Sequence, residues 1–340
     1  MAQISLGKTG LYVEQNGFGA LPIQRVSKQD AVYLLRKAYD GGMNFYDTAR
    51  SYSDSEEKLG EAFSGMWDKI VIATKIPAVD VPRFWDDLHT SLRMLRRDHI
   101  DIFQFHNPPI SPRPGDDGGL YDAMLEAKQQ GKIRFIGMTN HRLDVAQEAI
   151  NSGLYDTLQF PLSYLSTDKE LELVQACKEK EIGFIAMKAL SGGLITDSAA
   201  ACAWLSRFGH VVPIWGIQRE RELNEFLSYI PISPALSDEM MDRIEVDRQE
   251  LQGNFCRGCG YCMPCPQGIS INMCARASLL LRRAPSEIIL SEDGQQMMRK
   301  IEDCTECGQC SEKCPYGLDV PDLLKKNYED VKEVLAGKPI

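Results

Sequence analysis

Short apolar runs alternate with amphipathic stretches over residues 17–228, and this alternation constrains the fold more than any other feature. The runs are rich in Ile, Val and Phe, as in strands buried on both faces of a parallel sheet. They occupy residues 17–21, 44–47, 69–75, 99–106, 132–140, 156–161, 182–190 and 211–217. A stretch of helical period follows each, near residues 27–42, 55–63, 82–95, 120–130, 142–152, 168–180, 196–207 and 219–228. Eight such units joined by right-handed connections predict an α/β fold of the (β/α)8 TIM-barrel type.

An open doubly wound sheet is the alternative to the barrel. A dinucleotide-binding sheet of that kind has the pattern G-x-G-x-x-G after its first strand. The segment "GFGALP" at residues 17–22 lacks the third glycine, so the barrel is favoured. The opening residues 4–15 alternate around "GKTG", which predicts a small hairpin ahead of the barrel.

The composition bears on the partners of the chain. With a formal net charge of -10 over 340 residues, the protein is not expected to bind nucleic acid or an anionic membrane surface. We find no apolar run of about 18 residues and no secretory signal at the start, so we expect no membrane association and a cytoplasmic location.

Cysteine is distributed unevenly along the chain. Of the 11 cysteines, only Cys177 and Cys202 precede residue 250. Such clusters in a cytosolic protein bind metal more often than they form disulfides. We therefore predict two domains, a barrel over residues 1–235 and a cysteine-rich domain over residues 236–340.

Two cysteine runs predict iron–sulfur clusters. The run at residues 304–315 matches the bacterial ferredoxin pattern C-x2-C-x2-C-x3-C-P, in which the fourth cysteine ligates the other cluster. A second run covers residues 256–266. The expected ligands are Cys256, Cys259, Cys262 and Cys314 for one [4Fe-4S] cluster, and Cys304, Cys307, Cys310 and Cys265 for the other. The first run is one residue short before Cys265, so Cys274 is an alternative ligand, and zinc is the alternative metal. The apparent helices between the runs make this region resemble a small helical two-cluster ferredoxin.

Polar residues follow the predicted strands, where the chemistry of a barrel is found. They are Asp47, Tyr52, Lys75, His106, Thr139, Asn140 and Gln159. A tyrosine hydroxyl, with a pKa near 10, is a weak proton donor at neutral pH, and a nearby lysine lowers that pKa. An aspartate would hold the lysine in place, and a histidine could orient a substrate oxygen.

The segments 44–63, 72–75, 101–106 and 133–140 resemble the signatures of the aldo-keto reductase family, and the resemblance extends over about residues 3–230. It implies a barrel that reduces a small carbonyl compound, or oxidises the corresponding alcohol, with NADP or NAD. It makes Tyr52 the general acid and Lys75 the residue that lowers its pKa. It pairs Asp47 with Lys75 and gives His106 the role of orienting the carbonyl oxygen.

The same resemblance implies a set of cofactor-binding residues: Gly19, Ala20, Asp47, Thr139, Asn140, Gln159, Met187, Gly216, Gln218, Arg219 and Glu225. Met187 stands where the family often has an aromatic ring. Glu222 stands where many NADPH-dependent members have an arginine, which would favour NADH. Arg219 and Arg221 lie close enough to reverse that preference, so both cofactors stay open.

Three functional hypotheses follow. In the first, the clusters link an NAD(P)H-dependent reductase to a redox partner such as a ferredoxin or flavodoxin. In the second, the same reductase has purely structural clusters. In the third, the chain is a non-catalytic module for redox sensing or electron transfer, which the complete set of Asp47, Tyr52, Lys75 and His106 disfavours.

Overall fold

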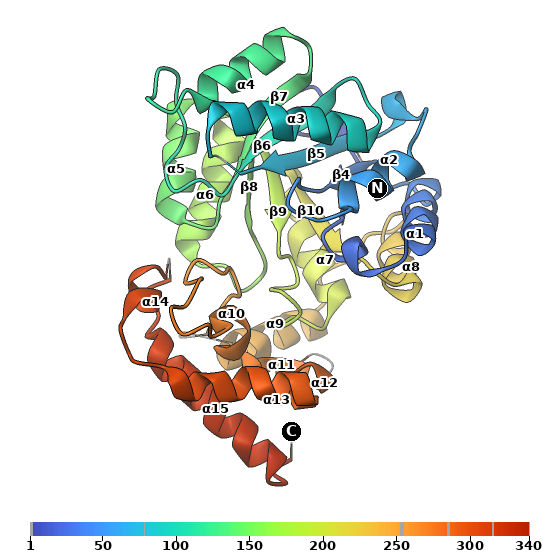
Figure 1. Cartoon of the computed structure of the whole chain (residues 1–340). Coiled ribbons are helices and arrows are strands. Elements are labelled where there is room, and N and C mark those ends of the chain that lie inside the picture. The colour runs from blue at the N-terminus through green and yellow to red at the C-terminus, as the bar shows by residue number, and fades with distance from the viewer. Residues whose placement is uncertain (1–2, 78, 252–254, 284–285, 315, 340) are drawn as a thin grey trace. The chain divides into compact units, whose positions relative to one another are not determined.

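The computed structural model describes residues 3–77, 79–251, 255–283, 286–314 and 316–339 (Figure 1). The chain divides into two compact units. Unit 1 comprises Met1–Ala189 and Ala199–Leu236, and unit 2 comprises Leu190–Ser198 and Ser237–Ile340. The segment Leu190–Ser198, which follows a barrel strand in sequence, thus groups with the second unit. The two-domain boundary at residues 235 and 236 itself stays a prediction.

Unit 1 contains a closed barrel of parallel strands, which confirms the predicted fold class. The strands neighbour one another in the order β10-β3-β4-β5-β6-β7-β8-β9. Their bounds are β3 Gly17–Gly19, β4 Phe45–Asp47, β5 Val71–Ile76, β6 Ile100–His106, β7 Ile133–Thr139, β8 Thr157–Pro161, β9 Gly183–Met187 and β10 Val211–Gly216. Because all eight run in the same direction, the residues at their carboxyl ends gather at one end of the barrel.

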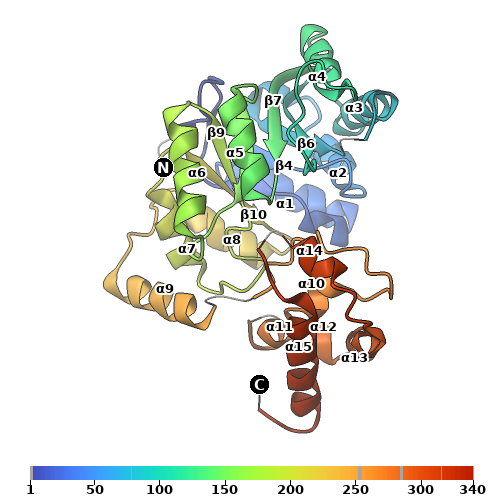
Figure 2. The same cartoon turned by 90° about the vertical axis from the view of Figure 1, so that its left-hand side faces the viewer.

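Helices connect the strands. They are α1 Lys28–Asp40, α2 Ser55–Ala62, α3 Val81–Leu95, α4 Leu120–Gln129, α5 Leu143–Ser152, α6 Asp168–Glu179, α7 Ser198–Ser206 and α8 Glu220–Ser228, with short 3-10 turns η1 Pro22–Arg25 and η2 Trp67–Lys69. Figure 2 shows α5 and α6 side by side on the outside of the sheet. Local sequence sets the helix starts: the side chain of Ser27 accepts a hydrogen bond from the backbone N–H of Asp30 and so caps α1.

The predicted N-terminal hairpin packs onto the interior of the barrel. It consists of β1 Ile4–Ser5 and β2 Tyr12–Val13, which pair in antiparallel fashion. Its buried residues Leu6 and Val13 share one apolar cluster with Phe45 and Val71, which begin β4 and β5. The hairpin therefore covers the amino-terminal end of the barrel and leaves the opposite end for the site.

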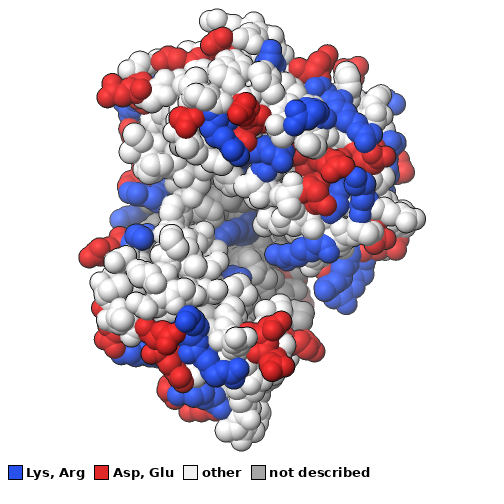
Figure 3. Space-filling model, in the orientation of Figure 1, with Lys and Arg blue, Asp and Glu red and all other residues white. Residues whose placement is uncertain are grey.

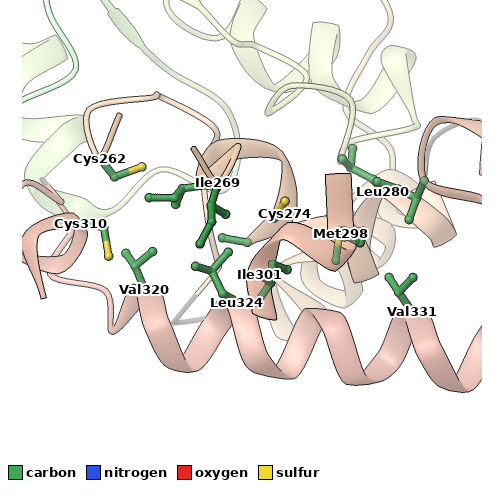
Figure 4. Packing of buried hydrophobic residues seen from close by; sticks show 14 of the residues in the cluster. Cys262, Ile269, Cys274, Leu280, Met298, Ile301, Cys310, Val320, Leu324 and Val331 are labelled. Carbon is green, nitrogen blue, oxygen red and sulfur yellow. The ribbon is translucent and has the colours of Figure 1, made fainter. Parts of the chain in front are cut away.

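Unit 2 is helical and has its own apolar core. Its helices are α9 Asp238–Glu250, α10 Ile271–Cys274, α11 Ala277–Arg283, α12 Glu287–Leu290, α13 Glu292–Arg299, α14 Gln309–Glu312 and α15 Val320–Leu335, with η3 Lys300–Asp303. Leu324 and Val331 of α15 pack in one cluster with Ile269, Met298 and other buried residues (Figure 4). Among the described residues, no helix is both long and apolar enough to cross a bilayer. On the face drawn in Figure 3, acidic and basic side chains are mixed.

Candidate active site and cluster-binding cysteines

A buried ion pair lies at the carboxyl ends of β4 and β5. These strands are neighbours, with Asp47 opposite Ala73. Nζ of Lys75 donates to Oδ1 of Asp47 at 2.7 Å and to the carbonyl oxygen of Thr48 at 2.6 Å. Burial raises the pKa of Asp47, and the charge of Lys75 opposes that rise. Oδ2 of Asp47 is buried and has no hydrogen-bond partner among the described residues. It can therefore accept a hydrogen bond from a hydroxyl group of a ligand.

Tyr52 lies beside this pair on the loop between β4 and α2. The ring centre of Tyr52 is 5.2 Å from Nζ of Lys75, and the ring meets that of His106 edge-on at 5.8 Å between centroids. Burial raises the pKa of Tyr52 above 10, while the charge of Lys75 lowers it. Lys75 thus lowers the pKa of Tyr52, as we expected, but the rise caused by burial is larger.

Side chains that the sequence did not single out hold the Tyr52 loop. The backbone N–H of Arg50 donates to the carbonyl oxygen of Lys75 at 2.8 Å. Glu56 is buried, forms an ion pair with Arg50, and accepts a hydrogen bond from Oγ1 of Thr74 at 2.7 Å. The only sequence signal was an acidic residue in the first turn of α2, which more often marks a solvated helix start.

His106 ends β6 opposite Thr139 of β7. Burial and the charge of Lys75 lower the pKa of His106 from 6.5 to about 3, so its imidazole is neutral over the ordinary pH range. Nδ1 of His106 lies 3.3 Å from Oγ of Ser51. A neutral imidazole has one N–H donor and one acceptor, which suits it to hydrogen-bond a carbonyl oxygen.

The residues expected to hold the nicotinamide lie on β7, β8 and the segments after them. Gln159 donates from Nε2 to Oδ1 of Asp47 at 3.3 Å and accepts at Oε1 from Gln104 at 2.8 Å. Oγ1 of Thr139 lies 3.8 Å from Sδ of Met187 at the end of β9. The structure thus brings Thr139, Gln159 and Met187 to the strand ends that carry Asp47 and His106.

Asn140 has a different position in the network. Its Nδ2 donates to the carbonyl oxygen of Pro108 at 2.9 Å, and its Oδ1 accepts from the backbone N–H of Arg142 at 2.8 Å. Both polar atoms therefore anchor loops at this end of the barrel.

The remaining cofactor candidates lie where β3 and β10 meet. A Cβ at Gly19 would lie 3.1 Å from the carbonyl oxygen of Trp215, so the two strands approach closely there. The backbone N–H of Ala20 donates to the carbonyl oxygen of Asp47 at 2.8 Å. Gly216 is the exposed last residue of β10, and Glu225 is exposed on α8.

Glu222 blocks the amino-terminal end of α8. Its Oε2 accepts hydrogen bonds from the backbone N–H groups of Gln218 at 3.0 Å and Arg219 at 3.1 Å. Its Oε1 lies 3.3 Å from Nη1 of Arg219. These two N–H groups belong to the residues directly before α8, so a carboxylate of the chain itself caps the helix start, where anions are often bound.

In unit 2 the cysteines line two cavities. The first is lined by Cys256, Cys259, Cys262 and Cys314, and the second by Cys262, Cys265, Cys304, Cys307 and Cys310. Each cavity is thus lined by one of the two predicted sets of four cysteine ligands, and Cys262 lines both cavities. Pro315, which closes the second run, lies outside the described residues.

Cys274 lines neither cavity. It is fully buried among Ile269, Met298 and Ile301, whereas Cys262 and Cys310 lie together at one end of the same cluster (Figure 4). Its Sγ lies 3.7 Å from the carbonyl oxygen of Met297. This location favours Cys265 over Cys274 as the fourth ligand of the second cluster.

The cysteines fit four-iron clusters better than single zinc ions. Zinc needs its ligands within about 2.3 Å of one point. In the part of the chain that the structure describes, no three His, Cys, Asp or Glu side chains are grouped closely enough to hold one metal ion. Four thiols around a cavity suit instead a cluster whose irons are spread over a larger volume.

Comparison with known proteins agrees with both units. The sequence model of the Aldo/keto reductase family matches residues 15–202, and that of a 4Fe-4S dicluster domain matches residues 255–319. An L-galactose dehydrogenase of Arabidopsis thaliana is 30% identical over 212 residues, which are 57% of this chain and 66% of that protein. An NADH-specific methylglyoxal reductase of Escherichia coli is 26% identical over 228 residues, 58% of this chain and 70% of that protein. The chain thus spans about two thirds of these relatives.

Solved structures show the same barrel. An aldo-keto reductase from Klebsiella pneumoniae in complex with NADPH has a TM-score of 0.62 at 22% identity, covering 72% of this chain and 95% of that one. A holo aldo-keto reductase from Bacillus halodurans has a TM-score of 0.63 at 20% identity, covering 73% and 96%. Fold and matched sequence define an oxidoreductase of the NAD(P)-dependent class. The chain belongs to the aldo/keto reductase family and carries a 4Fe-4S dicluster domain.

Proposed function

We propose that the barrel reduces a small aldehyde or ketone with NADH or NADPH, with Tyr52 as the proton donor. The supporting observation is the convergence of Tyr52, Lys75, Asp47 and His106 at the carboxyl ends of β4, β5 and β6. The orphaned Oδ2 of Asp47 is consistent with a ligand hydroxyl in the same place.

The residues of the chain supply the proton of the reaction and orient the reacting carbonyl group. When bound, reduced nicotinamide supplies two electrons and a hydrogen to the carbonyl carbon. The hydroxyl of Tyr52 gives its proton to the carbonyl oxygen, which completes the alcohol, and the resulting tyrosinate lies in the field of the Lys75 ammonium. Asp47 keeps that ammonium in place, and neutral His106 donates a hydrogen bond to the same oxygen.

A substrate panel tests this function. The purified full-length protein, with its clusters loaded, is incubated with NADH or NADPH and a set of small aldehydes and ketones. We expect at least one to yield its alcohol in a one-to-one ratio with oxidised nicotinamide. Nicotinamide binding without alcohol formation from any member of the panel would contradict the proposal.

We further propose that NADH is preferred over NADPH. A barrel often binds phosphate at the loops after its last strands and at a helix start there. The Glu222 carboxylate binds the N–H groups of the two residues directly before α8 and pairs with Arg219. A 2′-phosphate would have to displace it and would be repelled by its charge.

We propose that the clusters exchange electrons with an external redox partner of the ferredoxin or flavodoxin type. Cys307 supports this role, because it is an exposed residue in the lining of the second cavity. A cluster bound there would lie close to the surface, where a partner protein could dock. In a Cys307→Ala protein, we expect carbonyl reduction by NADH to continue while electron exchange with reduced ferredoxin is lost. Loss of the folded protein instead would indicate purely structural clusters.

A further inference from the structure

A basic side chain is held beside the first cysteine cavity by two glycines. Arg276 lies directly before α11, and its guanidinium packs against the backbone of Gly258 and Gly192. A Cβ on either glycine would lie 2.8 Å from Nη1 of Arg276. A side chain at either position would crowd the guanidinium, so the two glycines form a slot that leaves room for it.

The slot places the guanidinium next to a predicted cluster ligand. Gly258 lies between Cys256 and Cys259 in the first run, and its backbone N–H donates to Sγ of Cys256 at 3.4 Å. Burial lowers the pKa of Arg276, and the charge of Cys256 raises it. An arginine keeps its proton under these conditions, so the group is a fixed positive charge.

We find no group in the described residues that cancels this charge. Among the described residues, no carboxylate forms a salt bridge with Arg276, and its buried Nε has no hydrogen-bond partner. By contrast, Arg282 on α11 pairs with Asp330 through Nη1 at 2.5 Å and Nη2 at 2.9 Å. A partly buried cation with an incomplete set of acceptors is costly unless a nearby negative charge compensates it.

The second cavity differs from the first in its charged neighbours. The described residues that line it include no lysine or arginine, whereas Arg257 lines the first cavity in addition to Arg276 beside it. Lys325, which feels the charge of Cys304, pairs with Glu306 at 2.5 Å. The two cysteine sets therefore differ in their electrostatic surroundings although their ligands are alike.

We propose that Arg276 is an electrostatic tuning residue that raises the reduction potential of the cluster held by Cys256, Cys259, Cys262 and Cys314. Reduction adds one electron to a cluster, and a nearby fixed cation stabilises the extra negative charge. The partial burial of the guanidinium strengthens this effect, because it is poorly screened by water. The inference rests on the dicluster domain and is independent of carbonyl reduction by the barrel.

The test is a redox titration of the full-length, cluster-loaded protein followed by electron paramagnetic resonance. A Cys259→Ser protein identifies the signal of the first cluster. We expect Arg276→Gln to shift the one-electron equilibrium of that cluster about tenfold toward the oxidised form, which corresponds to about 59 mV. Arg276→Lys should retain most of the wild-type potential, and Arg282→Gln is the matched control that should move neither cluster.

An unchanged first-cluster potential in Arg276→Gln would overturn the proposal, as would an equal shift in Arg282→Gln. If Arg276→Gln does not bind a full complement of iron, Arg276→Met takes its place. This variant keeps the aliphatic part of the side chain and every cysteine but removes the positive charge. A lower potential for the first cluster in Arg276→Met supports the proposal, and an unchanged one overturns it.

Discussion

Nζ of Lys75 lies 2.7 Å from Oδ1 of Asp47, and both side chains are almost completely buried, with 1% and 4% of their surfaces exposed. A buried pair of this kind contributes little net stability, but removal of one partner leaves an uncompensated charge. We therefore infer that the role of the pair is to hold the ammonium group of Lys75 beside the Tyr52 ring.

Replacement of Lys75 by methionine should affect both stability and activity. It leaves Asp47 buried without its cation, which costs about 3 to 5 kcal/mol of unfolding free energy. Chemical denaturation measures this loss, and carbonyl reduction should fall below detection. Lys128→Met is the control, since Lys128 pairs with Asp156 at the surface at 3.1 Å and should contribute less than about 1 kcal/mol. Equal losses in the two variants would contradict the role of the buried pair.

The pH dependence of reduction should reflect two shifted groups. Burial raises the pKa of Tyr52 above 10, so its hydroxyl stays protonated through neutral and mildly alkaline pH. The pKa of His106 is lowered to about 3, so His106 does not titrate between pH 5 and 8. We expect kcat/KM for carbonyl reduction to be flat from about pH 6 to 9 and to fall only above that range. An inflection near pH 6.5 that is absent in His106→Asn would contradict this assignment.

Glu222→Gln should shift cofactor preference toward NADPH. The change removes the charge that would repel a 2′-phosphate and weakens the hold on the N–H groups of Gln218 and Arg219. We expect the ratio of kcat/KM for NADPH to that for NADH to rise about tenfold, equivalent to about 1.4 kcal/mol.

The matched control for this change is Glu220→Gln. Glu220 lies in the same first turn of α8 but binds the side chains of Lys37 and Tyr33. Its replacement should leave the ratio of kcat/KM for NADPH to that for NADH within about twofold of the wild-type ratio. A comparable rise in both variants would show that net charge, and not the capped helix start, sets the preference.

Iron counting distinguishes the two candidate ligands Cys265 and Cys274. Cys265 lines the second cavity and Cys274 does not. Two four-iron clusters give about eight iron atoms per chain. We expect Cys274→Ser to retain that number after anaerobic purification, and Cys265→Ser to lose about half of it or to show an altered second cluster. Iron loss confined to Cys274→Ser would reverse the ligand assignment.

The strand-end residues could be found from sequence because a parallel barrel brings the carboxyl ends of its strands together. Asp47 and His106 are the last residues of β4 and β6, and Lys75 is the last but one of β5, so their convergence follows from topology alone. The net direction of the Tyr52 pKa shift could not be predicted, since it depends on how deeply the ring is buried, and spacing along the chain carries no such information.

Tertiary contacts also distinguish alternatives that the sequence left open. The capping role of Glu222 depends on the orientation of its side chain toward the N–H groups of two residues. The spacing of Cys265 and of Cys274 along the chain is compatible with cluster binding. Only the packing shows that Cys265 lines the cavity and that Cys274 lies in the apolar core. The grouping of Leu190–Ser198 with unit 2 has no sequence signal, because it arises from contacts with residues distant in the chain.

Rapid mixing of Tyr52→Phe with NADH and a reducible aldehyde tests the central claim most directly. The variant keeps the ring beside Lys75 but lacks the proton, so we expect nicotinamide to bind as tightly as to wild type while its oxidation slows by about 10²- to 10⁴-fold. Tyr33→Phe removes a hydroxyl that binds Glu220 at 2.6 Å and should be as fast as wild type. Oxidation of NADH by Tyr52→Phe at the wild-type rate would contradict the assignment of Tyr52 as the general acid.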